Sequence, residues 1–212
     1  RPKTEAWYVI ERDPGAALFV GLQEGVDRRL FEESLSRGNV EDLLRRLPVE
    51  PGDFVFLPAG TVHAIGAGIV LAEVQQASDT TYRVFDWNRP GLDGRPRTLH
   101  VAEALEAIDF GHGGPASCRA NASGRPGLRC PAFSMELVGE DEGPAEIGDT
   151  GPVALLGVRG GGQRTVSVAG ETRDIGRGET MLVPASSSGR VTLSAGGLAV
   201  LAVLIENKNE RK

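Results

Sequence analysis

The sequence contains few of the residues that mark metal fingers, disulfide scaffolds or membrane spans. Among 212 residues there are two cysteines, Cys118 and Cys130, and three histidines. No CxxC pair or Cys/His cluster suggests a zinc finger, and we interpret the cysteines as free thiols, with a Cys118–Cys130 disulfide as the alternative. No run of 18 apolar residues occurs, which excludes a transmembrane helix. The opening residues do not form a signal peptide, so we expect a cytoplasmic protein.

The sequence also lacks an excess of basic residues. Its formal net charge is −6, which predicts no nucleic-acid partner and no binding to an anionic membrane, because both need basic surface. This charge does not argue against a local basic pocket for a phosphorylated small molecule. Apolar residues make up 40% of the chain, as in globular proteins.

Glycine and proline are frequent, with 29 and 13 residues, and they separate many short apolar runs. This pattern predicts a mainly β fold. Strands are predicted in both halves of the chain, over 6–10, 16–22, 53–57, 69–75, 81–87, 133–138, 153–158, 163–168, 180–183, 190–194 and 198–205. Helical periodicity is confined to 27–37, 39–47 and 100–109, with Asn39 as the N-cap of the second helix.

The chain divides into two β units. Residues 111–131 are rich in Gly, Pro, Ser and Arg and are predicted to be a linker between a first domain, 1–110, and a second, 132–207. The spacing Gly52-x5-Pro58 recurs 126 residues later as Gly178-x5-Pro184. This echo suggests two related units, although a chance match of a common turn is the alternative.

The first copy of this spacing continues to a histidine. The pattern Gly52-x5-Pro58-x-Gly60-x2-His63 resembles the second motif of the cupin superfamily, in which a buried strand ends in a tight turn and the histidine begins the next strand. A neutral imidazole inside a barrel is either hydrogen-bonded or a metal ligand. Taken alone, such a histidine is more often structural.

Three blocks are more specific. "PKTEAWYVI" at 2–10, "PAGTVHAIGAGIVLAEVQ" at 58–75 and "SDTTYRVFDW" at 78–87 resemble the type I mannose-6-phosphate isomerases, in particular the short bacterial form. The resemblance implies two cupin-like (jelly-roll) β-barrels, the first with a helical insertion at about 27–47 and the second free of metal. It also implies a zinc-dependent aldose–ketose isomerase that interconverts mannose 6-phosphate and fructose 6-phosphate through a cis-enediolate.

The resemblance also implies which residues hold the metal. One zinc ion per chain would be bound by Glu5 and His63, because these match the family's Lys-x-Glu block and its histidine after the turn. The family's remaining ligands lie in a block upstream of Lys3 that this sequence does not contain. We therefore expect a first domain without its N-terminal strands, with those ligands upstream of residue 1.

The catalytic candidates come from the same blocks. Arg83 lies where the family has its active-site arginine, and it would place a fixed positive charge near the enediolate. Lys3 and Glu73 match further pocket residues, and the sequence does not choose between them for proton transfer. Because side chains two apart on a strand share a face, Lys3, Glu5 and Trp7 are expected to point the same way.

The expected ligand is a small sugar phosphate, and the expected assembly is a monomer or a homodimer. A noncatalytic sugar- or phosphosugar-binding cupin that has lost its metal is the main alternative. An iron-dependent cupin oxygenase is a third, disfavoured because the three blocks match the isomerases.

Overall fold

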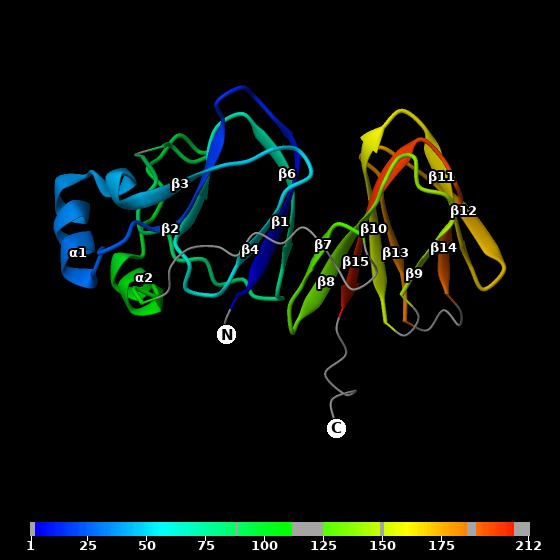
Figure 1. Ribbon diagram of the computed structural model, residues 1–212. Helices are drawn as coiled ribbons and strands as arrows, with labels where there is room; N and C mark the ends of the chain where they lie inside the picture. Colours follow the sequence, from blue (N-terminus) through cyan, green and yellow to red (C-terminus); the bar gives the residue numbers. More distant parts are fainter. Residues whose placement is uncertain (1–2, 88, 112–124, 149–150, 186–189, 206–212) are drawn as a thin grey trace. The chain divides into compact units, whose positions relative to one another are not determined.

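The computed structural model describes residues 3–87, 89–111, 125–148, 151–185 and 190–205 (Figure 1). The chain is mainly β, as predicted, and it divides into two compact units, Arg1–Ser117 and Cys118–Lys212. Cys130 is a buried free thiol, whereas Cys118 lies outside the described residues. No helix in the described ranges is long and apolar enough to span a membrane.

Two antiparallel sheets form the first unit. In each sheet one strand lies between two others, in the orders β4-β1-β6 and β3-β2-β5. The strands are β1 (Glu5–Arg12), β2 (Ala17–Leu22), β3 (Leu44–Pro48), β4 (Phe54–Leu57), β5 (His63–Ile65) and β6 (Ile69–Gln75). The core between them is apolar and includes Trp7, Val9, Leu18, Val20 and Val55. The central strand β1 therefore carries both core residues and, at its start, Glu5.

Helical structure in the first unit is shorter than predicted. Helix α1 (Arg28–Arg37) begins at Asp27, whose carboxylate accepts a hydrogen bond from the Leu30 N–H at 2.8 Å. It ends at Gly38, which has a left-handed backbone with φ of 73°. Helix α2 (Val101–Ala107) is the third predicted helix, trimmed at both ends.

The predicted helix over 39–47, and with it a helical insertion extending to residue 47, is wrong. Only Val40–Leu43 form a short 3₁₀ turn, and Asn39 makes no capping hydrogen bond with its side chain. Leu44–Pro48 instead form β3, which pairs with β2. Pro48 cannot donate a hydrogen bond inside a helix, whereas pairing with β2 gives the backbone of β3 its partners.

The predicted strand over 81–87 is also wrong, because these residues form no regular element. The Arg83 carbonyl accepts from the His100 N–H at 2.8 Å instead of from a neighbouring strand. Trp87 has a φ of 56°, which is incompatible with a strand. The segment after β6 is therefore a loop tied to the start of α2.

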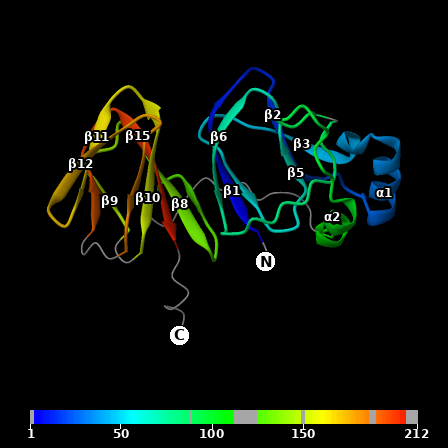
Figure 2. The same ribbon diagram turned by 180° about the vertical axis from the view of Figure 1, so that it is seen from behind.

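The second unit repeats the strand order of the first with extra strands added. Figure 2 shows strands β8, β9, β10, β11, β12 and β15 of this unit from behind. Its sheets have the orders β13-β10-β15-β8-β7 and β12-β11-β14-β9. The strands are β7 (Gly127–Arg129), β8 (Phe133–Val138), β9 (Ala145–Ile147), β10 (Val153–Gly160), β11 (Gln163–Val168), β12 (Glu171–Gly176), β13 (Thr180–Val183), β14 (Val191–Leu193) and β15 (Leu198–Ile205). Strands β7, β9 and β12 were not predicted. Strand β7 lies inside the stretch 111–131 that was predicted to be a linker, and it pairs with β8 instead. Strand β12 was missed because its exposed, polar sequence lacks apolar alternation.

The strand orders support the internal echo seen in the sequence. In each unit a central strand, β1 or β10, pairs with the strand that lies between the Gly and the Pro of the spacing, β4 or β13, and with a later strand, β6 or β15. The register with that later strand shifts between Val9 and Glu11 in the first unit and between Gly157 and Arg159 in the second. Because the two shifts lie at matching places in β1 and β10, the units share an architecture beyond the short motif.

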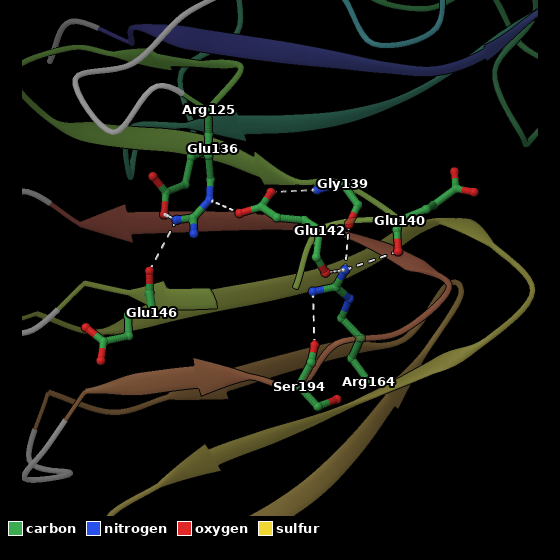
Figure 3. A network of polar contacts seen from close by, with 8 residues as sticks. All are labelled: Arg125, Glu136, Gly139, Glu140, Glu142, Glu146, Arg164 and Ser194. Atoms are coloured by element: carbon green, nitrogen blue, oxygen red, sulfur yellow. Dashed lines mark hydrogen bonds and ion pairs between the residues drawn. The ribbon is translucent and has the colours of Figure 1, made fainter. Parts of the chain in front are cut away.

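A buried arginine organises one end of the second unit (Figure 3). Arg164 is fully buried, and its guanidinium donates hydrogen bonds to backbone carbonyl oxygens, among them those of Leu198 at 2.8 Å, Glu142 at 3.0 Å and Ser194 at 3.1 Å. The carboxylate of Glu142 is bonded to Arg125. Burial lowers the pKa of Arg164, although a guanidinium remains charged at neutral pH. A single side chain thus satisfies the carbonyl groups of the two loops that close this end.

Replacing Arg164 should destabilise the chain. Arg164→Met would leave several buried carbonyl groups without donors, and we expect the free energy of unfolding to fall by about 3 kcal/mol. Urea denaturation followed by circular dichroism measures this change. Arg173→Met, on the exposed strand β12, is the matched control and should change stability by less than about 0.5 kcal/mol. Equal effects of the two variants would contradict this role for Arg164.

Candidate functional site

Two glycines shape the turns on either side of β4. Gly52 lies in the turn before this strand, and Gly60 lies in the turn between β4 and β5. Gly52 and Gly60 have φ angles of 100° and 90°, which other residues rarely adopt. A side chain at Gly60 would also place its Cβ 2.9 Å from the Ala107 carbonyl oxygen. The Gly60 carbonyl accepts a hydrogen bond from the Asp109 N–H at 3.0 Å, which ties the turn to the end of α2. The Gly-x5-Pro-x-Gly spacing is thus required by the backbone, and it brings His63 to the first position of β5.

His63 faces Glu5 across the interior of the first unit. The distance between His63 Nε2 and Glu5 Oε2 is 3.4 Å, and Lys3 Nζ lies 2.9 Å from the other oxygen, Glu5 Oε1. Glu5 is only 4% exposed. A buried carboxylate needs charged or hydrogen-bonding partners, and Lys3 and His63 are on two sides of it. The expected common face of Lys3 and Glu5 is consistent with this contact.

The hydrogen bond on the far side of the imidazole determines what Nε2 can do. His63 Nδ1 lies 2.9 Å from the Thr61 carbonyl oxygen, which can only accept, so Nδ1 carries the proton. In the neutral ring the lone pair of Nε2 therefore points toward a carboxylate oxygen. The ring is also held by Trp7, whose indole meets it edge-on at a centroid distance of 5.2 Å. Two acceptors facing each other require a proton or a metal cation between them.

Glu5 and His63 do not form a complete metal site by themselves. Within the described residues, no group of three or more His, Cys, Asp and Glu side chains is placed to hold a metal ion. His100 takes part in a different contact, in which its Nδ1 accepts from the Arg83 N–H at 3.4 Å. His112 lies outside the described residues.

A pocket of about 680 Å³ opens beside this pair. Lys3, Glu5, His63 and Arg83 all line it, so four of the five residues singled out from the sequence share one cavity. Arg83 is oriented by a hydrogen bond from its Nη1 to the Thr98 carbonyl oxygen at 3.3 Å. Lys3 Nζ reaches Thr81 Oγ1 at 3.4 Å as well as Glu5. The site thus combines a carboxylate–imidazole pair with two cationic side chains.

Glu73, the fifth of these residues, does not line the pocket. It is exposed on β6 and pairs in register with Trp7, while Gln75 pairs with Glu5. Residues opposite each other on neighbouring strands point to the same face. Glu73 is therefore on the same face of the sheet as Glu5, but one pair further along the strands.

Within its described residues, the second unit has no counterpart of this pair. When β10 is aligned with β1 by their matching register shifts, Val153 takes the position of Glu5. Val153 is buried in the apolar core. Strand β14, the counterpart of β5, contributes the buried Val191 and Leu193. Gly189, which the echo aligns with His63, lies outside the described residues.

Sequence reasoning missed two cationic residues of the pocket, Arg89 and Arg97. They lie in a segment rich in Gly and Pro, where neither helical nor strand periodicity assigns a direction to a side chain. It also missed the environment of Trp7, whose Nε1 is buried without a hydrogen-bond partner among the described residues. No pattern in the sequence distinguishes that indole from an ordinary core residue.

Comparisons with known proteins agree in pointing to one group of enzymes. No protein-family model matches the chain. It is 34% identical over 188 residues to a mannose-6-phosphate isomerase of Streptococcus mutans, a match that covers 86% of this chain and 58% of that protein. It is 43% identical over 107 residues to a mannose-6-phosphate isomerase of Bacillus subtilis, covering 50% and 34%. The chain thus spans little more than half the length of the first relative and about a third of the second.

Solved structures give the same result. The crystal structure of the Bacillus subtilis mannose 6-phosphate isomerase has a TM-score of 0.76 and 27% identity, covering 96% of this chain and 65% of that one. A phosphomannose isomerase variant from Salmonella typhimurium has a TM-score of 0.69, but at 15% identity it supports the fold alone; the match covers 97% and 66%. In sequence and in fold, the chain is homologous to the mannose-6-phosphate isomerases over the part of those proteins that it spans.

Proposed function

We propose that the protein carrying this chain is a zinc-dependent isomerase that interconverts mannose 6-phosphate and fructose 6-phosphate. The observation that supports this most strongly is the placement of Glu5, His63, Lys3 and Arg83 in one pocket. The named relatives give the substrate, and the pocket offers the kinds of groups that an aldose–ketose isomerisation needs. These are a polarising cation, a fixed positive charge and a group able to exchange a proton.

The geometry of Glu5 and His63 fits two ligands of one zinc ion. Ligand atoms about 2.0–2.1 Å from a tetrahedral zinc are about 3.3–3.4 Å apart, and the two facing atoms here are 3.4 Å apart. The Nδ1–H bond to Thr61 gives His63 the tautomer and orientation of a ligand, as second-shell partners do in zinc sites. Bound zinc would polarise the sugar oxygens at the reacting carbons.

The remaining roles fall to the cationic residues. Arg83 would stabilise the negative charge that develops on the cis-enediolate, because its guanidinium stays protonated and is held by Thr98. Lys3 lines the pocket and Glu73 does not, so we assign to Lys3 the transfer of the proton between the two neighbouring carbons. Lys3 Nζ also contacts Glu5 Oε1 at 2.9 Å, which keeps it beside the proposed metal ligands.

A noncatalytic sugar- or phosphosugar-binding protein is the second candidate. It is favoured by the finding that Glu5 and His63 are joined by no third metal-binding side chain within the described residues. Two protein ligands hold zinc less well than three or four. Metal content and turnover separate the two candidates.

Removing either proposed ligand should remove the metal and the activity. In the whole gene product we expect about one zinc per chain, falling below about a tenth in His63→Ala and Glu5→Gln, with isomerase turnover reduced about a hundredfold or more. Inductively coupled plasma mass spectrometry and a coupled assay for fructose 6-phosphate measure the two quantities. Glu11→Gln, at the other end of β1, is the control and should retain both.

The results would separate three cases. Zinc and turnover lost together in both variants would support the isomerase. A folded wild-type protein with neither zinc nor turnover would favour the binding protein. Turnover that survives in His63→Ala would contradict the proposed role of His63.

Arg83 should affect the reaction without affecting the metal. Arg83→Met removes the fixed charge beside the reacting carbons, and we expect kcat to fall about a hundredfold or more while zinc content stays unchanged. Arg83→Lys should recover only part of the loss, because an ammonium does not reproduce the planar guanidinium. A kcat within threefold of wild type in Arg83→Met would rule out this role.

A further inference from the structure

The pocket has a second polar region on the segment that follows Arg83. Four cationic side chains line the pocket, Lys3, Arg83, Arg89 and Arg97, together with the carboxylate of Glu5. The chain as a whole has a formal net charge of −6. Positive charge gathered in a hollow of an acidic protein concentrates the field there and favours an anionic ligand.

Asp86 anchors two of these arginines. Arg97 Nε donates to Asp86 Oδ2 at 2.6 Å, and Arg89 Nε donates to the Asp86 backbone carbonyl oxygen at 3.2 Å. Asp86 is only 6% exposed, so its carboxylate is a fixed support inside the protein and not a surface group. Because both Nε atoms contact the same residue, the two guanidinium groups are neighbours.

The anchoring leaves the outer nitrogens of both arginines available. Each side chain is held through Nε, and no hydrogen bond of its terminal nitrogens occurs among the residues that the structure describes. Guanidinium groups fixed in this way present pairs of N–H donors that match the oxygens of a phosphate. An arginine that merely neutralised Asp86 would be expected to use its terminal nitrogens as well.

Trp87 fixes the direction of Arg89. The guanidinium carbon of Arg89 lies 5.4 Å from the centre of the Trp87 ring, within the range of a cation–π contact. The Trp87 backbone has a φ of 56°, a strained conformation for a large side chain, and its Nε1 donates to the Glu41 carboxylate. Such strain persists only where the surroundings hold it, and it is typical of ligand sites.

We propose that Arg89 and Arg97 form the phosphate-binding end of the pocket, with Asp86 as the residue that positions them. The ligand group is the phosphate monoester of an open-chain hexose, and this assignment rests on the proposed function. In a hexose 6-phosphate the ester lies at the opposite end from the two reacting carbons. The pocket correspondingly takes Arg89 and Arg97 from a different part of the chain than Glu5 on β1 and His63 on β5.

Binding of mannitol 6-phosphate tests this proposal, because this hexitol has no carbonyl group and cannot be isomerised. Isothermal titration calorimetry on the whole gene product should show that mannitol 6-phosphate binds at least a hundredfold more tightly than mannitol. Arg97→Met and Arg89→Met should each raise the Kd for mannitol 6-phosphate at least tenfold, because each removes charged donors to the phosphate. Neither should bind unphosphorylated mannitol more weakly than wild type does.

The matched control is Arg95→Met, which removes the same charge from the same segment at an exposed position that does not line the pocket. Its Kd should stay within twofold of wild type. Arg97→Met leaves Asp86 buried without its ion pair, so Arg89→Met, whose anchor is a carbonyl group, keeps the test valid if the first variant does not fold. Asp86→Asn should weaken mannitol 6-phosphate binding and leave zinc content unchanged, as expected for a positioning residue.

Failure of this proposal differs from failure of the proposed function. Wild-type isomerase activity with unchanged mannitol 6-phosphate binding in Arg89→Met and Arg97→Met would overturn the phosphate site alone. Arginine-dependent binding without any turnover would support the phosphate site and count against the isomerase. A loss in Arg95→Met equal to that in the pocket variants would show only a general charge effect and would overturn the proposal.

Discussion

The burial of Glu5 is the constraint on which the site depends. A carboxylate that is 4% exposed inside a β unit is costly without partners, and Lys3 and His63 supply them from two directions. The position of each partner has its own cause. Lys3 shares a face with Glu5 because it lies two residues away on the same extended chain. His63 reaches it because Gly60 allows the chain to turn back between β4 and β5.

The comparison of the two units shows how one architecture can serve two purposes. The strand orders and the bulge in the central strand are shared, but Val153 replaces Glu5 and the counterpart of β5 is apolar. Among the described residues of the second unit, the fully buried charged side chain is Arg164, and its hydrogen bonds to loop carbonyl oxygens stabilise the structure. The candidate site of the first unit therefore depends on a few polar side chains, because the strand arrangement itself is common to both units.

Much of the fold and part of the site could be predicted from the sequence, for physical reasons that differ by residue. Apolar alternation predicted the core strands, and the Gly-x5-Pro-x-Gly spacing predicted the turn before His63. The helix over 39–47 failed because a 3₁₀ turn followed by β3 has similar apolar spacing. Arg89 and Arg97 were missed because their direction depends on tertiary contacts with Asp86, which no local pattern encodes.

The most direct test of the account is the location of zinc in a crystal of the whole gene product, by anomalous scattering at the zinc absorption edge. We predict a peak within about 2.2 Å of both a Glu5 carboxylate oxygen and His63 Nε2. A peak elsewhere, or none after the protein has been supplied with zinc, would contradict the account. His63 and Glu5 would then be a structural pair joined by a proton.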